Sequence, residues 1–325
     1  MSGGAAPGEG WLPVAAQWRE GGFAVDWCHF GATPLAEPFF GDSVARRLAL
    51  PFNQLFRPQT PIAALGDWAA RAPGLAPAGF VFHASRCGST LLAQLLAALP
   101  QSLVLSEAPP LDAVLRAGGS DAPDEAERIR WLRWMMNALG QKRRGDEQHL
   151  FVKFDCWHAL DLPLIRKAFP GVPCLFLYRE PLALLASHLR RRGAHTVPGL
   201  MPPQVFGIDP AAAALMPPAE YCARVLASIL GAALRHANEA DLLLIRYRNL
   251  PDALWGPIAA HFGIDCDDAD RAALAEVARH DAYAPGTVFV PRAGRDAEPP
   301  AASYAAAEAW LDPIYRQLEA RRLAG

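Results

Sequence analysis

Short apolar runs alternate with longer stretches of mixed polarity from Gly79 onward. Strands that are buried on both faces of a parallel sheet are short and almost continuously apolar. The runs that fit this description are 80–83, 103–105, 150–154, 173–178 and 242–246. Alternation of such strands with helices indicates βαβ units. We therefore predict an α/β fold, a three-layer sandwich with a mostly parallel central sheet.

The stretches between these runs contain mostly helix-forming residues. The predicted helices span 89–99, 124–143, 159–168, 181–192, 219–238 and 251–262, with a final helix over 303–322. The segment 193–218 is rich in proline and glycine and is long enough to be a functional lid or substrate loop. The segment 281–300 predicts a second such loop.

The first 75 residues lack this alternation and are rich in Pro, Gly and Trp. Within them, GFAVDWCHFG (22–31) predicts a strand, and DSVARRLAL (42–50) predicts a short helix with Asp42 as its N-cap. RAPGLAPAG (71–79) has the composition of a linker. We expect an N-terminal extension, 1–75, that packs on or near a main domain, 76–325.

Composition excludes several classes of protein. With 325 residues, of which 52% are hydrophobic and 20% charged, the chain can form a sizeable core and is not disordered throughout. The net charge of −2 gives no global reason to expect nucleic-acid binding. The cysteines form no C-x-x-C pair, so neither a zinc site nor a disulfide framework is indicated. With no signal peptide and no apolar run of membrane-spanning length, we expect a cytoplasmic protein.

The stretch FHASRCGSTLLAQLL (82–96) joins a predicted strand to a helix through a small polar loop. Backbone N–H groups at a helix start can surround an anion, and the helix dipole adds partial positive charge. Gly88 allows close approach, Ser89 and Thr90 add hydroxyl donors, and Arg86 adds a forked cation. Ser89 stands where an ATP-binding loop has lysine. The loop is therefore suited to a phosphate or sulfonate, with an ordinary capped helix start as the alternative.

Cys87 lies inside this loop. A helix N-terminus and a neighbouring arginine both favour the thiolate. We therefore expect a reactive thiol whose alkylation is blocked by a bound nucleotide.

A second strand-to-helix junction, CLFLYREPLALLASHLRRR (174–192), contains another set of anion-binding groups. Arg179 stands at the end of the predicted strand, and Pro181 suits the first helical position. Ser187 and Arg191 are four residues apart, which predicts that they share one helix face. A ligand outside the carboxyl ends of the strands would meet these groups. Two separate anion sites suit a small molecule with two separated phosphates, although a helix cap or a surface salt bridge would explain either segment alone.

Together these segments resemble the sulfotransferases that use 3′-phosphoadenosine 5′-phosphosulfate (PAPS). SRCGSTLL resembles the loop for the 5′-phosphosulfate, and YREPLALLAS resembles the motif for the 3′-phosphate. LLLIRYRNLPDALWGPIAAHFGI (242–264) resembles a later strand and helix of the family, so the resemblance covers about 79–264. It implies a P-loop NTPase-like sulfotransferase fold, PAPS as donor, 3′-phosphoadenosine 5′-phosphate (PAP) as product, and no metal. The implied donor-binding residues are Arg86, Cys87, Gly88, Ser89, Thr90, Arg179, Ser187 and Arg191.

The sequence departs from the family's pattern at its catalytic strand. Ser85 replaces the usual proline of the loop, and Cys87 replaces a serine. In VKFDCWH (152–158), Lys153 matches the family's Lys-x-His, but Asp155 stands where the histidine would be. The base that takes the acceptor's proton must therefore be sought elsewhere.

Glu107, in VLSEAPP, is our candidate for this base. It follows the second predicted strand, and it resembles a glutamate that serves as base in protein-tyrosine sulfotransferases and some bacterial sulfotransferases. Lys153 and Arg86 are expected to stabilise the leaving oxygen. Asp155 and His158 remain alternative bases, and a helix-capping role remains an alternative for Glu107.

The resemblance predicts transfer of a sulfuryl group to a hydroxyl or amine of a small-molecule, carbohydrate or peptide acceptor. A P-loop kinase is one rival, although the missing loop lysine argues against it. A non-catalytic nucleotide-binding or interaction protein is a second rival, because it would keep the anion-binding residues and need no base.

Overall fold

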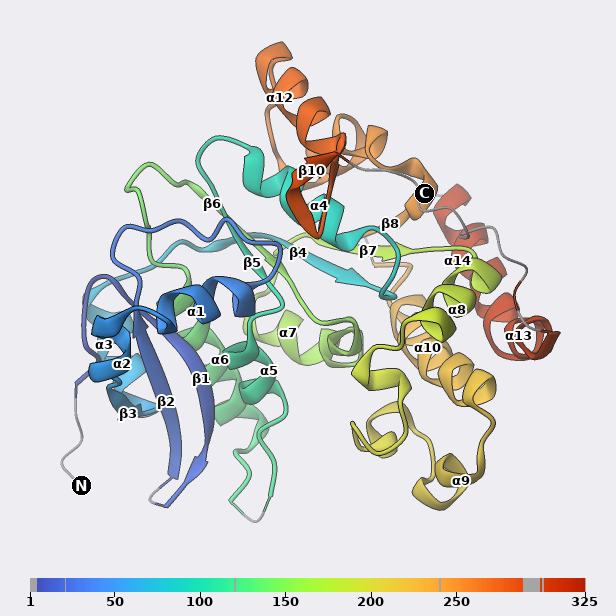
Figure 1. Ribbon diagram of the computed structural model, residues 1–325, viewed down its shortest axis with the longest axis horizontal. Coiled ribbons are helices and arrows are strands. Elements are labelled where there is room, and N and C mark those ends of the chain that lie inside the picture. Colours follow the sequence, from blue (N-terminus) through green and yellow to red (C-terminus); the bar gives the residue numbers. More distant parts are fainter. Residues whose placement is uncertain are drawn as a thin grey trace.

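The computed structural model describes residues 5–20, 22–119, 121–239, 241–288, 299 and 301–324. A five-stranded sheet in the order β5-β6-β4-β7-β8 forms its centre, and all neighbouring strands are parallel (Figure 1). The strands are β4 (Pro77–His83), β5 (Ser102–Ser106), β6 (His149–Lys153), β7 (Cys174–Tyr178) and β8 (Leu242–Arg246). The predicted parallel α/β sheet is thus confirmed, with every strand close to its expected bounds.

Helices cover both faces of this sheet because successive strand residues point to opposite sides. On β4, Phe80 and Phe82 pack in one apolar cluster and Val81 in another. The layer on the side of Val81 consists of α4 (Ser89–Ala98), α11 (Pro257–Phe262) and α12 (Asp268–Ala278). The opposite layer includes α5 (Pro109–Leu115), α6 (Glu125–Leu139), α7 (Leu162–Ala168) and α10 (Pro218–Arg235). Figure 1 shows α4 and α12 above the sheet and α6 and α7 below it.

The N-terminal part forms its own antiparallel sheet beside this sandwich. Its strands are β1 (Trp11–Arg19), β2 (Gly22–His29) and β3 (Gln59–Pro61). Helices α1 (Phe40–Leu48) and α2 (Pro51–Leu55) connect β2 to β3, and α3 (Ala63–Arg71) follows β3. Phe23 of β2 stacks on Trp131 of α6, with ring centroids 5.0 Å apart. The two parts therefore share one apolar cluster, and Trp131 is buried.

Several local expectations for this part were wrong. α1 begins at Phe40 with Phe39 as its N-cap, so Asp42 lies in the first turn and does not cap the helix. Strand β1 was not expected, because its residues do not alternate cleanly and its pairing with β2 shifts between Pro13 and Ala15. The linker is shorter than predicted, because β4 begins at Pro77.

The later helices are more broken than the sequence suggests. The predicted helix 159–168 is a 3₁₀ helix, η1 (Cys156–Asp161), followed by α7, and 251–262 splits into η5 (Asp252–Leu254) and α11. Helix α8 spans Pro181–Arg190, and the segment 193–218 contains two short 3₁₀ helices and α9 (Pro210–Leu215). The C-terminal helix is confirmed as α13 (Ala301–Ala306), a π-turn and α14 (Asp312–Ala324).

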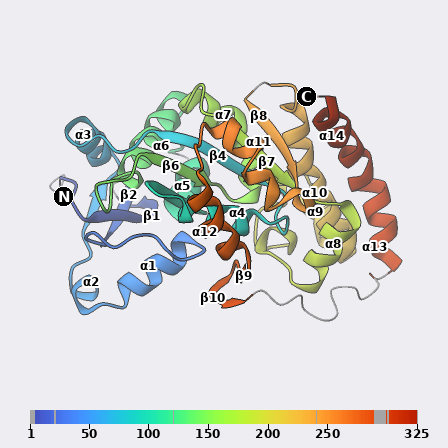
Figure 2. The ribbon, with the colours of Figure 1, turned by 90° about the horizontal axis from the view of Figure 1, so that it is seen from above.

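The predicted loop at 281–300 was wrong in its first part. There, β9 (His280–Asp281) and β10 (Ala284–Val288) form a small antiparallel pair, while residues 289–298 and 300 lie outside the described residues. Figure 2 shows this pair beside α12, with α13 and α14 along the opposite flank next to α8 and α10.

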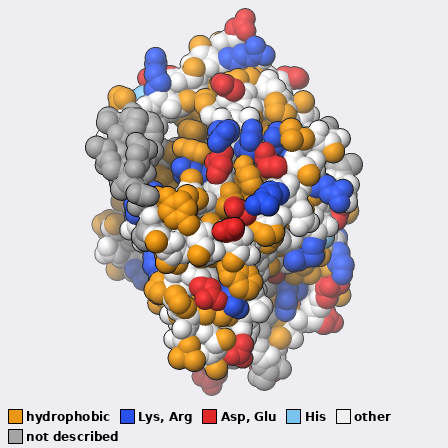
Figure 3. All heavy atoms as spheres, turned by 90° about the vertical axis from the view of Figure 1, so that its right-hand side faces the viewer, with side chains coloured by type: hydrophobic (Ala, Val, Ile, Leu, Met, Phe, Trp, Pro, Cys, Tyr) orange, Lys and Arg blue, Asp and Glu red, His pale blue; other side chains and the backbone are white. Residues whose placement is uncertain are grey.

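On the flank formed by the C-terminal helices, acidic and basic side chains lie interspersed rather than separated by sign (Figure 3). Ion pairs account for part of this mixing, such as Arg246–Glu319 at 3.0 Å and Arg248–Glu180 at 2.6 Å. No helix among the described residues is both long and apolar enough to cross a bilayer.

Candidate active site

The predicted anion-binding loop, residues 84–88, connects β4 to α4 and has an unusual backbone. We call it the anion loop. Ser85 and Arg86 have positive φ angles of 62° and 48°, although neither is glycine. Such conformations cost energy and tend to persist at functional sites. Gly88, the N-cap of α4, has a φ of +85°, and a Cβ there would lie 2.8 Å from the Tyr247 ring. The loop therefore requires glycine at this position, and it leads into the first turn of α4, whose N–H groups have no partner within the helix.

Cys87 is fully buried, and Ser89 and Thr90 of the same predicted set are buried as well. The Cys87 side chain is 0% exposed, and its Sγ lies 3.3 Å from the carbonyl oxygen of Leu177, to which it donates. Burial raises the pKa of Cys87 to about 12, outweighing the loop's hydrogen bonds and the nearby cations. The expected reactive thiolate is therefore wrong, because the side chain packs into the sheet while only the backbone faces the loop.

Arg86 links the two anion-binding segments. Its Nη2 donates to the carbonyl oxygen of Arg191 at 2.8 Å, across 105 positions of sequence. From the second segment, Nη1 of Arg179 reaches the carbonyl oxygen of Arg86 at 3.5 Å. The structure thus brings the two motifs together at the carboxyl ends of β4 and β7, as a single bipartite ligand would require.

Tyr247, which sequence reasoning missed, supports Arg179. The guanidinium of Arg179 lies over the Tyr247 ring, 4.7 Å from its centroid, and its Nε is buried without a hydrogen-bond partner among the described residues. A cation held in this way has a fixed direction and an unused donor. Tyr247 lies in RYRNL, and no spacing rule connects it to Arg179.

The expected shared face of Ser187 and Arg191 was wrong. Helix α8 ends at Arg190, and Arg191 is its C-cap in an extended conformation, with φ −144° and ψ 95°. The N–H of Arg191 donates to the carbonyl oxygen of Ser187 at 3.3 Å, so the two residues are adjacent but their side chains do not follow helical spacing. Arg191 is exposed and Ser187 is half-buried.

Glu107 and Lys153 form an ion pair where two neighbouring strands end. Parallel pairing of β5 with β6 sets Ser106 opposite Lys153, so Glu107 follows directly beside the lysine. Glu107 Oε1 lies 2.5 Å from Lys153 Nζ, and the Glu107 N–H donates to the Lys153 carbonyl oxygen at 2.8 Å. Lys153 is 1% exposed and Glu107 is 24% exposed. The carboxylate therefore faces outward while its partner is buried.

His83, the last residue of β4, ties this pair to the anion loop. Its Nδ1 accepts a hydrogen bond from the Ser85 N–H at 3.0 Å, so Nε2 carries the proton of the neutral ring. That nitrogen lies 3.0 Å from the Phe154 carbonyl oxygen and 3.4 Å from Glu107 Oε1. Both ring nitrogens of His83 therefore contact backbone groups. Burial lowers the pKa of His83, which keeps the ring neutral.

The charge state of Glu107 follows from these neighbours. Burial alone would raise the pKa of Glu107, but the ammonium of Lys153 and the hydrogen bond from His83 lower it to about 2. Glu107 is thus ionised at neutral pH. Its affinity for a proton is low for as long as Lys153 remains its partner.

Phe39 brings the N-terminal part to the same place. Lys153 Nζ lies 4.8 Å from the centroid of the Phe39 ring, and Phe39 contacts Tyr283 with ring centroids 5.9 Å apart. Sequence reasoning missed Phe39, because nothing in 1–75 resembles a site motif, and it missed Tyr283, because that residue lies in the predicted loop 281–300. The described site is therefore built from both parts of the chain.

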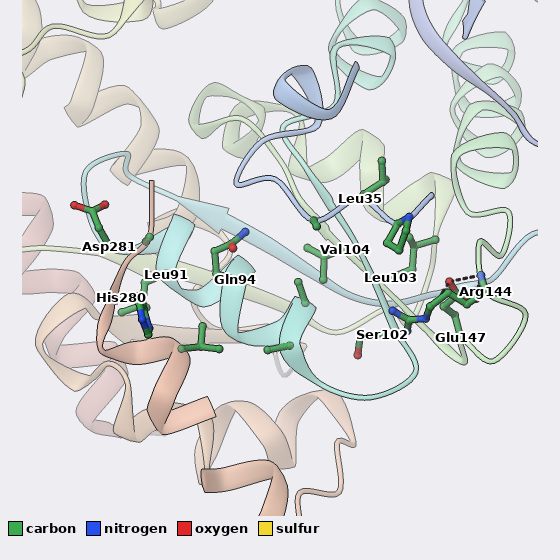
Figure 4. Close-up of a pocket in the computed structure, with 16 residues that line it drawn as sticks. Leu35, Leu91, Gln94, Ser102, Leu103, Val104, Arg144, Glu147, His280 and Asp281 are labelled. Atoms are coloured by element: carbon green, nitrogen blue, oxygen red, sulfur yellow. Dashed lines mark hydrogen bonds and ion pairs between the residues drawn. The ribbon is translucent and has the colours of Figure 1, made fainter. Parts of the chain in front are cut away.

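A cavity of about 260 Å³ runs along the outer side of α4. Figure 4 shows Leu91 and Gln94 of α4 on its wall, with His280 and Asp281 at one end and Arg144 and Glu147 at the other. It begins one residue after Thr90 but contains none of the predicted site residues. It therefore offers space next to the anion loop without being part of it.

Comparison with known proteins gives structural matches only. No protein-family model and no curated protein matches the sequence. A sulfotransferase from Alicyclobacillus acidocaldarius matches with 15% identity over 76% of this chain and 96% of its own, at a TM-score of 0.43. Sulfotransferase STF9 from Mycobacterium avium matches with 14% identity over 77% and 81%, at 0.46. Mouse SULT7A1, crystallised with PAP, matches with 12% identity over 80% and 90%, at 0.42.

Each of these three structures is a sulfotransferase, the class that the two sequence motifs resemble. Because every TM-score lies below 0.5, the function proposed next depends on the geometry of this chain's own residues.

Proposed function

We propose that the protein is a sulfotransferase that moves a sulfuryl group from PAPS to a hydroxyl or amine of an acceptor. The observation that carries this proposal is the Glu107–Lys153 ion pair beside an anion loop at the carboxyl ends of three parallel strands. A nucleophile's proton acceptor and a cation for the leaving oxygen are the two groups that in-line sulfuryl transfer requires.

The proposed donor-binding residues suit a nucleotide that carries one phosphate on the 3′ oxygen and one on the 5′ oxygen of its ribose. The strained loop and the first turn of α4 provide backbone and hydroxyl donors for one anion, and Arg179 keeps a buried, unused donor for the other. The residues that would hold the donor are Arg86, Cys87 through its backbone, Gly88, Ser89, Thr90, Arg179, Ser187 and Arg191. When bound, PAPS supplies the sulfuryl group.

Lys153 has two possible partners in this mechanism. In the free protein it neutralises Glu107. As negative charge develops on the leaving oxygen, Lys153 turns toward that oxygen together with Arg86, and Glu107 loses its cation. The proton affinity of Glu107 then rises, because the ammonium was the group that lowered it.

The bonds change in one displacement. The acceptor oxygen or nitrogen forms a bond to sulfur, the bond from sulfur to the leaving phosphate oxygen breaks, and the acceptor's proton passes to Glu107. Phe39 lies over Lys153, so it would limit the access of water to this region. A kinase mechanism is disfavoured, because Ser89 occupies the place of the lysine that contacts the β- and γ-phosphates of ATP.

Calorimetry with PAP, AMP and magnesium-ATP tests the donor. PAP should bind much more tightly than AMP or ATP, because only PAP reaches both anion sites. Tighter binding of magnesium-ATP would contradict the proposal. Turnover of radiolabelled donor is then screened with carbohydrate, phenolic, lipid and peptide acceptors. PAP binding without transfer to any acceptor would favour the non-catalytic nucleotide-binding protein.

A further inference from the structure

The N-terminal part has a group of large apolar side chains on its outer surface, in and beside α2. The four residues, with exposed fractions from 40% to 79%, are Leu50, Phe52, Leu55 and Phe56. Elsewhere among the described residues, no stretch of seven positions contains more than two exposed large apolar side chains. Single exposed apolar residues are ordinary, whereas a group of them marks a surface that a partner covers. We call these four residues the α2 patch.

A buried asparagine holds the α2 patch in place. Asn53 is 1% exposed, and its Oδ1 accepts a hydrogen bond from the His29 N–H at 2.8 Å. Its Nδ2 donates to the carbonyl oxygens of His29 and Arg47 at 2.8 and 2.9 Å. The rings of Phe52 and Phe56 lie 4.8 Å apart on the other side of the segment. The polar side chain therefore points inward to β2, and the fold itself keeps the apolar side chains exposed.

Arginines border the α2 patch on both sides in the sequence. They are Arg46 and Arg47 at the end of α1, and Arg57 directly after Phe56. No acidic residue occurs between Asp42 and Asp67. Arg46 pairs with Glu37 at 2.8 Å, whereas Arg47 and Arg57 have no carboxylate partner among the described residues and donate to backbone carbonyls. The border of the patch therefore keeps an excess of positive charge.

The α2 patch lies far from the C-terminal helices. Figure 2 shows α1 and α2 at the end of the molecule opposite α13 and α14, and Figure 1 shows them beside the N-terminal sheet. An apolar surface at one end of a molecule can meet a flat and extended partner. The partner must offer apolar contact for the patch and negative charge for its border.

We propose that the α2 patch binds the surface of a lipid bilayer that contains anionic lipids. Phe52, Leu55 and Phe56 enter the boundary between headgroups and acyl chains, while Arg46 and Arg57 contact the headgroup phosphates. Phe and Leu beside Arg is the combination by which proteins lie on a membrane without crossing it. Arginine suits the border because its stem covers apolar surface while its guanidinium stays in the polar layer. This binding does not depend on the proposed function.

A second copy of the chain is a less suitable partner. Around a twofold axis the α2 patch of one copy would face the same patch of the other. The arginines on the two borders would then lie close together, and such like-charge contacts are unfavourable. An anionic bilayer complements the apolar side chains and the arginines at once. Charge therefore favours the bilayer.

Flotation of the full-length protein with lipid vesicles tests the proposal. The protein should float with vesicles of equal parts phosphatidylcholine and phosphatidylserine, and much less with phosphatidylcholine alone. Binding should fall as salt is raised, because salt screens the attraction of the arginines to the anionic surface. Leu55→Ser combined with Phe56→Ser should weaken binding by about tenfold or more, since two apolar side chains no longer leave water. Leu215→Ser is the matched control: it removes an 87% exposed leucine of α9, outside the patch, and should leave binding unchanged.

Arg46→Gln combined with Arg57→Gln provides a second test that leaves the apolar side chains intact. Binding to the phosphatidylserine vesicles should weaken and lose most of its salt dependence, and urea denaturation checks that each variant folds. Absence of flotation, equal binding to both kinds of vesicle, or unchanged binding in the serine variant would overturn the proposal. Sedimentation without lipid tests the second copy, because a dimer that the serine variant abolishes would assign the patch to self-association instead. Vesicle binding by a protein without transferase activity would refute only the sulfotransferase.

Discussion

At the scale of single residues, Glu107 combines two properties that conflict in the free protein. We propose it as the base, yet Lys153 and His83 lower its pKa to about 2. A base works best when its pKa is near the working pH. Release of Lys153 toward the donor resolves the conflict, and it makes the base effective only when the donor is bound.

Glu107→Gln should therefore reduce turnover by about 10²- to 10⁴-fold, because the amide cannot accept the acceptor's proton. PAP affinity should not fall, since Glu107 faces the acceptor and its replacement frees Lys153 from the ion pair. A nucleotide-release assay with pooled acceptors measures turnover, and calorimetry measures PAP affinity. Asp155→Asn is the matched control and should cost less rate. Near-full turnover in Glu107→Gln together with inactive Asp155→Asn or His158→Ala would mean that the base is a different residue.

The same ion pair should be visible in the acid stability of the protein. The folded-state pKa of Glu107 lies below its ordinary value of 4.5, so its contribution is complete above that pH and is lost as pH falls toward about 2. Glu107→Gln also leaves Lys153 buried without its partner. The difference in Tm between wild type and this variant should thus shrink below about pH 4.5. A difference that stays constant down to about pH 2 would contradict the ion pair.

Arg179→Ala should cost roughly 2–4 kcal/mol in PAP binding, the range for losing one partner of a charged, hydrogen-bonded pair. The loss should be specific to the 3′-phosphate, because Arg179 belongs to the second anion site. Calorimetry with PAP and with AMP, which lacks that phosphate, makes the comparison. Equal losses for both ligands would show that Arg179 supports the Arg86 carbonyl and the Tyr247 ring rather than the nucleotide.

At the scale of elements, the sequence predicts well what depends on local pattern. The continuously apolar strands β4 to β8 and the polar loop before α4 were found because burial on both faces leaves a clear signature. The burial of Cys87 was not predictable from the sequence. The helix N-terminus and the neighbouring arginine can be recognised in the sequence, but the packing of the thiol against β7 is a tertiary contact. The position of Arg191 was missed for a related reason: apolar spacing does not reveal that α8 ends at Arg190.

The turn into α4 gives a prediction at this scale. Gly88 has a left-handed backbone, and a Cβ added there would lie 2.8 Å from the Tyr247 ring. Gly171 has a similar φ of +78°, but a Cβ added there would have no neighbouring atom within 4 Å. Gly171→Ala should lose about 1–2 kcal/mol of stability from the backbone alone. Gly88→Ala should lose more, and PAP affinity should fall only in this variant. Urea denaturation and calorimetry compare the two, and equal effects would show that the contact with Tyr247 is unimportant.

At the scale of the whole molecule, the N-terminal part is joined to the sheet domain at two places. Phe23 stacks on Trp131 at the apolar cluster, and Phe39 lies over Lys153. The sequence separated 1–75 from the rest by composition, but composition cannot show tertiary contacts. We propose from these contacts that the two parts unfold as one cooperative unit.

Trp131→Ala tests this cooperativity. Trp131 is 6% exposed and packs between α6 and the N-terminal sheet, so its truncation should cost about 3–5 kcal/mol. If the parts unfold together, urea denaturation should keep a single transition that moves to lower urea when followed by circular dichroism and by tryptophan fluorescence. Trp18→Ala, which removes a 36% exposed neighbour of the same ring, is the control and should cost less. Two separate transitions, of which Trp131→Ala moves only one, would show that 1–75 is an independent unit. The contribution of Phe39 to the site would then depend on how the two parts dock and not on their folding together.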